Sequence, residues 1–260
     1  METSSGSVVF DRAAEFYDAT RSLSQEASAA VTELLASEVQ GKGRVLEIGV
    51  GTGRIALPLV ERGIEIVGID LSVPMLRKLL EKAGSSSVPV VVSDATRLPF
   101  TDHSFGAAIA CHVLHLIRDW TQAVDELVRV SETAGTILVD QGGWRQGFLQ
   151  DLEKRFAESA GIDRAWVGLQ KVEDLDSAMA ARGAGVRVLP KISDKRAIAP
   201  GSIIDSFEQG IFSFTWGLEP EERQRAAAAT REWAVQEFGS LNEPRTVELS
   251  TGWRAYELPG

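Results

Sequence analysis

The chain has 260 residues, enough for one large α/β domain with an insertion. Hydrophobic residues make up 44% of it and charged residues 25%, as in ordinary globular proteins, which excludes disordered and fibrous classes. The formal net charge of -10 opposes nucleic acid as a partner, because phosphate binding normally needs a basic face. No apolar run is long enough to span a membrane, and the single cysteine, Cys111, is compatible with a reducing compartment. We therefore expect a cytoplasmic protein.

Short apolar runs alternate with helical patterns in the first half of the sequence. These runs are residues 44–49, 65–70, 88–93, 105–111 and 135–141. Such alternation predicts a doubly wound α/β fold, with a mostly parallel sheet covered by helices on both faces. The runs are apolar almost throughout, as expected of strands buried on both sides. Residues 186–190 and 245–258 also have strand character, and we expect the latter to close the sheet.

Two of the connecting helices have clear start and stop signals in the sequence. After the second run, Ser72 is suited to cap a helix, Pro74 fits its first turn and Gly84 fits its end. Later in the chain, Asp119 with Gln122 resembles a capping box. We therefore expect helices to begin near these two caps, on the connections between strands.

The sharpest motif is a glycine-rich turn between the first run and the next helix. Gly49, Gly51 and Gly53 allow a tight turn and a close approach of a ligand, and the following helix start favours an anionic group. An acid, Glu47, precedes the first glycine. The dinucleotide fingerprint instead wants a glycine or alanine at the position of Arg54. The turn predicts a ligand site at the carboxyl end of the first strand.

Acids also end the next two strands. Asp70 is placed to accept hydrogen bonds from both hydroxyls of a ribose, in either an NAD or an adenosylmethionine site, although it is also suited to cap the next helix. Asp94, followed by Ala95, is placed to accept a hydrogen bond from an adenine amino group. Acids at the ends of three consecutive strands are hard to assign to capping alone.

With these motifs the chain resembles the class I S-adenosylmethionine-dependent methyltransferases, in particular the bacterial type that includes ubiquinone and menaquinone C-methyltransferases. The resemblance covers residues 10–142 and includes the segments 98–100, 104–105 and 111–115 on either side of the fourth strand. It implies a seven-stranded Rossmann-like sheet with an antiparallel last strand. Two departures stand out: Gly106 replaces a usual Asp, and residues 131–135 replace a usual Leu-Lys-Pro-Gly-Gly turn.

The resemblance also implies which residues contact S-adenosylmethionine. Glu47 and the glycine turn would hold the methionine part, Asp70 and Leu71 the ribose, and Asp94 with Ala95 the adenine. Cys111 and His112 would lie near the methionine end. Tyr17 and Arg21 belong to an N-terminal piece that would fold over the cofactor, with Arg21 near its carboxylate, although Phe16 and Tyr17 are equally suited to packing on the sheet.

Four regions of a single domain are expected on this basis. They are an N-terminal helical cover (1–40), a cofactor-binding core (41–142), acceptor-side helices with an insertion (143–240) and a closing strand (241–260). Helices starting at Pro200 and Pro220 carry a dense set of aromatic residues. That set is suited equally to a lid and to a satellite core.

The acceptor is expected to be a small molecule. The chain lacks the Asn/Asp-Pro-Pro-Tyr/Phe tetrapeptide of resembling nucleic-acid methyltransferases, and Cys111-His-Val-Leu occupies its place. His115 is the preferred general base, since imidazole titrates near neutral pH, although a structural histidine in the following helix explains it as well. Asp140 and Gln141 follow the fifth strand and are candidates for the acceptor pocket. A mainly apolar or aromatic acceptor is favoured by Trp144, Phe148, Phe207, Phe212 and Trp216.

Two alternatives remain at this point. One is an NAD-dependent oxidoreductase, in which Gly51 and Gly53 cradle a pyrophosphate. The other is a non-catalytic module that retains adenosylmethionine. No metal site is expected, and the sequence leaves open the acceptor, the methylated atom and the oligomeric state.

Overall fold

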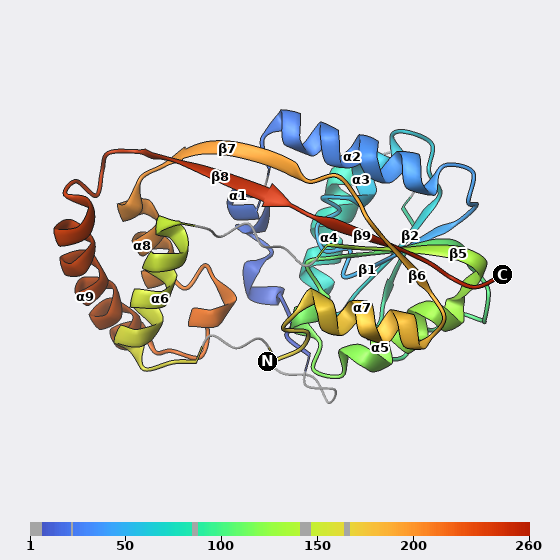
Figure 1. Ribbon diagram of the computed structural model, residues 1–260. Coiled ribbons are helices and arrows are strands. Elements are labelled where there is room, and N and C mark those ends of the chain that lie inside the picture. Colours follow the sequence, from blue (N-terminus) through green and yellow to red (C-terminus); the bar gives the residue numbers. More distant parts are fainter. Residues whose placement is uncertain (1–6, 22, 85–87, 141–146, 164–166) are drawn as a thin grey trace. The chain divides into compact units, whose positions relative to one another are not determined.

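A computed structural model describes residues 7–21, 23–84, 88–140, 147–163 and 167–260 (Figure 1). The chain forms two compact units, each made of separate stretches of sequence. Unit 1 comprises Met1–Gly142, Trp166–Ile192 and Thr251–Gly260, and unit 2 comprises Gly143–Ala165 and Ser193–Ser250. The region expected to carry the acceptor-side helices is therefore divided, because residues 166–192 belong to the unit that contains the sheet.

Unit 1 is built on a seven-stranded sheet with the order β3-β2-β1-β4-β5-β9-β6. Its strands are β1 (Val45–Ile48), β2 (Ile66–Asp70), β3 (Val90–Val92), β4 (Phe105–Cys111), β5 (Ser131–Asp140), β6 (Gly185–Val188) and β9 (Trp253–Glu257). The pairs from β3 to β5 are parallel, whereas β9 runs antiparallel to both β5 and β6. The predicted doubly wound sheet with an antiparallel last strand is confirmed.

Helices cover both faces of this sheet (Figure 1). They are η1 (Asp11–Ala13), α1 (Tyr17–Arg21), α2 (Gln25–Val39), α3 (Ala56–Val60), α4 (Val73–Ala83), η2 (Leu114–Leu116), α5 (Trp120–Val130) and α7 (Val172–Ala181). One hydrophobic core contains side chains of α5 and α7, and the other contains side chains of α2, α3 and α4. The parallel strands contribute to both cores, which is why every residue of β1 and β4 is buried and why Glu47 is the one charged residue in these two strands.

The predicted caps are only partly confirmed. The Ser72 side chain accepts a hydrogen bond from the Met75 N–H (3.3 Å), and Gly84 ends α4 with a φ of 56°. Asp119 does stand at the N-cap of α5, but its side chain accepts no capping hydrogen bond. The predicted capping box at Asp119 and Gln122 is therefore wrong in its side-chain contacts, although the helix start is right.

Two strand predictions need correction. β3 lies at the edge of the sheet, so it is not buried on both sides, and Val92 is 56% exposed. The run from Arg245 to Leu258 is not one closing strand, because it divides into β8 (Arg245–Thr251) and β9. β8 pairs with β7 (Ile192–Ile198) in a separate two-stranded sheet, and β9 lies between β5 and β6 rather than at the edge.

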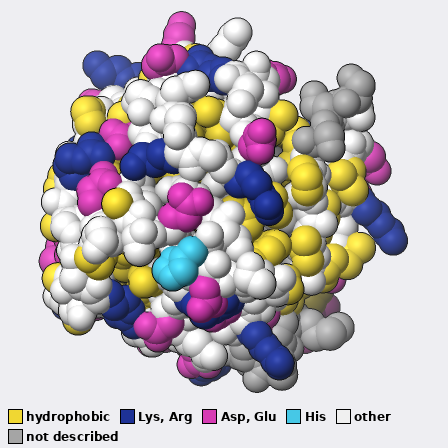
Figure 2. All heavy atoms as spheres, turned by 90° about the vertical axis from the view of Figure 1, so that its right-hand side faces the viewer, with side chains coloured by type: hydrophobic (Ala, Val, Ile, Leu, Met, Phe, Trp, Pro, Cys, Tyr) yellow, Lys and Arg dark blue, Asp and Glu magenta, His cyan; other side chains and the backbone are white. Residues whose placement is uncertain are grey.

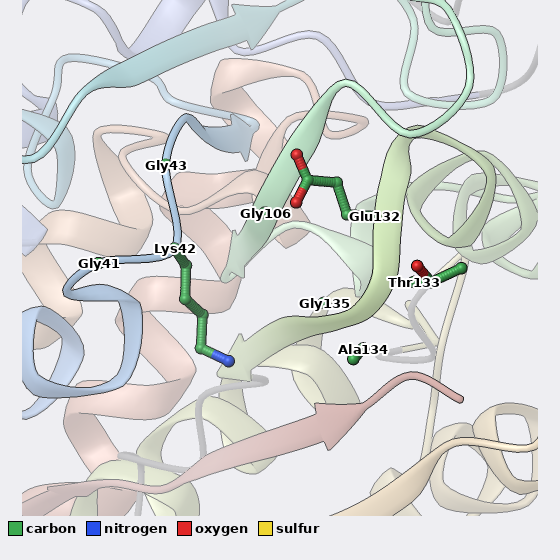
Figure 3. A pocket seen from close by; sticks show the side chains of 8 residues that line it. All are labelled: Gly41, Lys42, Gly43, Gly106, Glu132, Thr133, Ala134 and Gly135. Atoms are coloured by element: carbon green, nitrogen blue, oxygen red, sulfur yellow. The ribbon is translucent and has the colours of Figure 1, made fainter. Parts of the chain in front are cut away.

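Gly106, one of the two departures from the family pattern, has a packing reason. A Cβ on this residue would collide with the backbone carbonyl of Lys42, because β4 passes the turn before β1 closely. A pocket of about 240 Å³ lies beside this contact and is lined by Lys42, Gly106, Glu132 and neighbouring residues (Figure 3). An aspartate at 106 is incompatible with this backbone arrangement.

Unit 2 has its own hydrophobic core, built from aromatic side chains. Its elements are α6 (Phe148–Ala160), α8 (Pro200–Glu208), η3 (Ser213–Thr215) and α9 (Pro220–Phe238), with most of β7 and β8. The Phe207 ring lies 5.1 to 5.4 Å from those of Phe156, Phe212 and Phe214. Phe207 and Phe212 are thus buried in a satellite core, which settles their role in packing. None of the described helices is both long and apolar enough to cross a membrane.

Candidate active site

The register of the parallel strands brings the predicted residues to one edge of unit 1. Glu47 pairs with Gly68 on one side and Ile109 on the other, and Cys111 pairs with Asp140. Since the carboxyl ends of parallel strands meet at the same edge, the glycine turn, Asp70, Cys111 and Asp140 gather there. We call this the carboxyl edge of the sheet. The 240 Å³ pocket lies at the opposite, amino edge, away from the acids that suggest chemistry.

Glycine is required at each of the three positions of the turn for a different structural reason. All three have a positive φ, between 54° and 82°. A Cβ on Gly49 would press into Val113, and one on Gly53 would come within 2.9 Å of Leu57, so these two are needed for packing. A Cβ on Gly51 would lie 3.3 Å from the Met75 methyl and 3.8 Å from the Gly49 carbonyl oxygen. Gly51 is therefore the least crowded of the three glycines.

Asp70 ties the glycine turn to the second strand. Its Oδ2 accepts a hydrogen bond from the Gly51 N–H (2.9 Å) and its Oδ1 accepts one from the Ser72 N–H (2.8 Å). Burial raises the pKa of Asp70, and these backbone hydrogen bonds oppose the rise. The side chain that caps α4 is that of Ser72, so the alternative role of Asp70 as the cap of this helix is wrong. Each oxygen of a carboxylate has a second lone pair, so further donors are accommodated.

Glu47 is a buried acid with one oxygen left over. The carboxylate accepts a backbone hydrogen bond from Ala56, whereas Oε2 is buried and has no partner among the described residues. Burial raises the pKa of Glu47 to about 8, with the nearby Arg54 guanidinium opposing that rise. A buried acceptor without a donor is costly in a native protein, which indicates that a ligand supplies the donor.

Asp94 is engaged in its own turn. Its Oδ1 accepts hydrogen bonds from both the backbone N–H and the hydroxyl of Thr96, each at 2.9 Å. Ala95, next to it, is buried. The structure thus places this pair after β3, as expected, while its predicted contact with adenine stays a prediction.

The N-terminal segment is attached to the glycine turn. The Thr52 hydroxyl donates to Asp18 Oδ1 (2.5 Å), and Lys82 of α4 pairs with Asp18 Oδ2 (2.8 Å). Burial raises the pKa of Tyr17, whose other electrostatic neighbours include Arg54, Cys111, Arg21 and Asp70. Tyr17 is therefore part of the carboxyl edge rather than a residue packed elsewhere on the sheet.

A buried polar cluster lies beside the ends of β4 and β5. His112 Nε2 is 2.9 Å from Asp140 Oδ2, and the Asp140 side chain is 1% exposed. Arg54 donates to Cys111 Sγ (3.3 Å) and interacts electrostatically with Asp140 and Glu47. Burial raises the pKa of the Cys111 thiol well above its usual range, against the influence of Arg54. We call Arg54, Cys111, His112 and Asp140 the polar cluster.

Sequence reasoning missed two features of this cluster. Arg54 was noted only as a departure from the dinucleotide fingerprint, although a cation in the turn just before an apolar helix is a visible signal. The preferred base, His115, lies in η2, and its ring centroid is 6.5 Å from that of His112. The histidine that meets the carboxylate is thus His112. Gln141 and Trp144, proposed for the acceptor pocket, lie outside the described residues.

Known proteins agree with this arrangement. Residues 46–139 match a family model described as a methyltransferase domain. A demethylmenaquinone methyltransferase of Thermobifida fusca is 29% identical over 65% of this chain and 73% of its own length. A phosphatidylethanolamine N-methyltransferase of Cereibacter sphaeroides is 33% identical over 44% of this chain and 59% of its own length. The crystal structure of the YcgJ protein from Bacillus subtilis shares the fold, with a TM-score of 0.62 at 19% identity over 90% of this chain and 99% of that one.

These matches, with the sheet order and the glycine turn, support an S-adenosylmethionine-dependent methyltransferase that is similar to the class I enzymes. Within that class the chain is similar to the quinone methyltransferases. The finding decides against the NAD-dependent oxidoreductase.

The residues present fit the cofactor. The unsatisfied Oε2 of Glu47 suits an ammonium group, and the Gly51 N–H holds the Asp70 carboxylate beside the glycine turn. The two carboxylates therefore supply the hydrogen-bond acceptors and the negative charge that S-adenosylmethionine requires.

Proposed function

We propose that the enzyme holds S-adenosylmethionine at the carboxyl edge of unit 1 and passes its methyl group to a small, mainly apolar or aromatic acceptor. The observation that carries the cofactor part is Glu47, whose buried Oε2 lacks a donor among the described residues. The methionine ammonium would supply that donor. Asp70 with Leu71 would bind the ribose, Asp94 with Ala95 the adenine, and Arg21 the carboxylate of the cofactor.

The cofactor supplies an electrophilic methyl on a sulfonium, so the protein's task is alignment and exclusion of water. The glycine turn and Asp70 form one preorganised unit, because a backbone hydrogen bond joins them before any ligand arrives. The N-terminal segment, attached through Asp18 to Thr52 and Lys82, supports a cover over this part of the edge. Cys111 stays a neutral thiol in this proposal, since burial raises its pKa, and packs near the methionine end.

Support for the acceptor comes from the relatives and from charge. The Thermobifida fusca relative is named for demethylmenaquinone, an aromatic acceptor. On the face drawn in Figure 2, acidic and basic side chains are interspersed, with no continuous basic stripe. Phe207 and Phe212 do not enter the argument, because they are already packed in the core of unit 2.

The acceptor test uses tritiated S-adenosylmethionine and two probes. One is a reduced demethylmenaquinone with a short isoprenoid chain, and the other is phosphatidylethanolamine in phosphatidylcholine vesicles, chosen for the Cereibacter sphaeroides relative. We expect label in the quinol. Label only in the lipid amine rejects the aromatic acceptor, and no label in either, with cofactor bound, favours the non-catalytic module.

The cofactor test follows proton release. If the ammonium pairs with Glu47, binding ionises a carboxyl whose pKa burial has raised to about 8, so a proton leaves the protein at neutral pH. Calorimetry at pH 7 in buffers of different ionisation enthalpy measures that proton directly. Glu47→Gln should bind the cofactor more weakly and release no proton. Proton release equal in wild type and variant contradicts the assigned contact.

A further inference from the structure

Two polar side chains around the start of β9 are buried without hydrogen-bond partners. Trp253, the first residue of β9, is 1% exposed, and Thr251, the last residue of β8, is 5% exposed. Neither Trp253 Nε1 nor Thr251 Oγ1 has a partner among the residues that the structure describes. A buried polar group left unpaired destabilises the folded protein, so each of the two needs an explanation. The cofactor contacts proposed above use neither of them.

The strand register places Trp253 beside the polar cluster. Trp253 pairs with Asp140 in the antiparallel ladder between β9 and β5, and Asp140 pairs with Cys111 in the parallel ladder between β5 and β4. Directly paired residues point to the same face of a sheet, and Cys111 and Trp253 belong to one hydrophobic core. Thr251 precedes Trp253 by two residues, the spacing at which side chains of an extended chain share a face. The two unpaired groups therefore lie at the carboxyl edge.

The order of the strands puts these groups on the acceptor side of the proposed cofactor site. In that site adenine lies after β3, ribose after β2 and the methionine part after β1, so the cofactor runs along the edge toward β4. β5 and β9 continue the edge beyond it, with β9 roughly 10 Å from β4 at the usual strand spacing. In-line transfer requires the acceptor to approach the methyl from the side away from the sulfur. The end of the edge that the cofactor leaves open, at β5 and β9, is therefore the place for the acceptor.

The chemistry of the two groups limits what they hold. An indole N–H only donates a hydrogen bond, whereas a hydroxyl both donates and accepts. The group that satisfies Trp253 must therefore be a hydrogen-bond acceptor, such as a carbonyl, ether or hydroxyl oxygen, and an ammonium is excluded. A buried donor also discriminates against a molecule that lacks the matching oxygen, because binding that molecule leaves the donor unpaired.

We propose that the Trp253 indole, together with the Thr251 hydroxyl, binds an oxygen substituent of the methyl acceptor and so selects oxygen-bearing acceptor molecules. The indole N–H donates to one lone pair of that oxygen, and the Thr251 hydroxyl donates to the other. Both residues orient the acceptor and take no proton from it. Binding then satisfies two groups that are unpaired in the acceptor-free protein, which adds to the affinity. This inference rests on the proposed function.

The first test removes each polar atom and measures KM. Trp253→Phe keeps an aromatic ring but is smaller, so benzothienylalanine at the same position, in which sulfur replaces the N–H, serves as the isosteric variant. Thr251→Val keeps the branched shape. We expect each variant to raise KM for the reduced demethylmenaquinone probe about fivefold or more, with cofactor affinity unchanged. Without acceptor, the Tm of Thr251→Val should equal or exceed that of wild type, because an unpaired buried hydroxyl has been removed.

Tyr256→Phe is the matched control in the same strand. The Tyr256 hydroxyl donates to Asp176 Oδ1 at 2.7 Å, so this variant removes a polar group that is already satisfied within the protein. We expect Tyr256→Phe to lower Tm and to leave KM for the acceptor within twofold of wild type. The contrast with Thr251→Val separates a group that binds the acceptor from one that stabilises the fold.

A second readout needs no turnover. The protein has 6 tryptophans, so comparison with Trp253→Phe assigns the Trp253 indole proton in an NMR spectrum. Without acceptor we expect this resonance at the upfield position of an indole that makes no hydrogen bond. Adding the reduced demethylmenaquinone to protein loaded with S-adenosylhomocysteine should move it downfield, because the new hydrogen bond deshields the proton. A tryptophan with only a packing role would not respond in this way.

Each outcome supports or overturns the inference. KM within twofold of wild type in both Trp253 variants excludes the indole contact while methyl transfer stays intact. A resonance that is already downfield without acceptor, and does not move on its addition, shows that the N–H is satisfied inside the protein, for example by a buried water. If only phosphatidylethanolamine is labelled, the variants are compared on that lipid, where a rise in KM supports the inference and its absence overturns it. Wild type that labels neither probe overturns the proposed function and this inference together.

Discussion

The two edges of the central sheet both depend on glycine, but for opposite reasons. At the carboxyl edge, Gly51 has a positive φ and its N–H donates to Asp70, and Glu47, a buried acid with an unsatisfied oxygen, lies at the same edge. At the amino edge, Gly106 has no spare room, because the Lys42 carbonyl occupies the place of a side chain. Glycine allows a backbone turn with positive φ at one edge and the close approach of two backbones at the other.

The difference separates function from folding within one sheet. Changes at the carboxyl edge should alter cofactor affinity, proton balance and rate. Changes at the amino edge should alter only the free energy of unfolding. A cavity is therefore a weaker guide to the functional site than a buried polar atom without a hydrogen-bond partner. The 240 Å³ pocket lies at the amino edge, whereas the buried acids lie at the carboxyl edge.

The largest expected effect concerns Glu47 and pH. Its pKa is raised from 4.5 to about 8 in the folded protein, so folding favours the protonated form. The stability from this group is complete below pH 4.5 and is lost as pH rises through about 8. Between pH 4.5 and pH 9, the unfolding free energy of the wild-type protein without cofactor should fall by about 5 kcal/mol more than that of Glu47→Gln. Urea unfolding of both proteins from pH 5 to pH 9 measures it, and parallel curves refute it.

Next comes Gly106→Ala. The added methyl would meet the Lys42 backbone, which has no flexible side chain to move aside, so we expect a loss of about 3 kcal/mol or more. Thermal and urea unfolding provide the measurement. Gly185→Ala in β6 is the control, because its added Cβ meets nothing within 4 Å. Equal stability of the two variants would show that the close backbone contact at Gly106 does not matter for folding, contrary to the proposed difference between the two edges.

Asp70→Ala should have a smaller effect, on affinity. Removing a charge-assisted acceptor for the ribose should weaken cofactor binding tenfold or more, or about 1.4 kcal/mol. The variant also loses the hydrogen bond to the Gly51 N–H, so calorimetry should be accompanied by Asp70→Asn, which keeps one acceptor oxygen. Unchanged affinity in folded Asp70→Ala rules out the ribose contact.

The smallest effect is expected at Lys42. Its ammonium donates to the Thr136 hydroxyl at 2.6 Å at the amino edge, with a side chain 31% exposed. Lys42→Met should lower the unfolding free energy by about 1 kcal/mol or less and leave cofactor affinity unchanged. A clear change in affinity would show that the amino edge communicates with the cofactor site.

The sequence was sufficient for the sheet and the glycine turn because each strand carries a local signal. Apolar runs, Ser72 as a cap and Gly84 as an end can be read from neighbouring residues. The strand order around β9 could not, because its place between β5 and β6 depends on contacts between distant residues. The run from Arg245 to Leu258 has strand character throughout but belongs to two sheets. Its residue composition does not show where one strand ends and the other begins.

The site was predictable in its acids and less so in its partners. Glu47, Asp70 and Asp140 lie at or next to the carboxyl ends of strands β1, β2 and β5, so topology alone gathers them. Whether His112 or His115 meets Asp140 depends on the turn after β4, where one residue takes a positive φ. That turn is set by tertiary packing around Val113, which presses against Gly49. No rule of spacing identifies such a contact.

The position of β9 also bears on how the chain is made. β6 is complete at residue 188, but its partner β9 starts at residue 253, so residues 189–252 are synthesised in between. At about 5 to 20 residues per second, β6 and the outer side of β5 remain without β9 for roughly 3 to 13 s. Unpaired strand edges invite association with other chains during such an interval. Val186 and Val188 are exposed even on the folded strand, so they add apolar surface to this unpaired strand. A chaperone that shields nascent chains should therefore raise the yield of this protein.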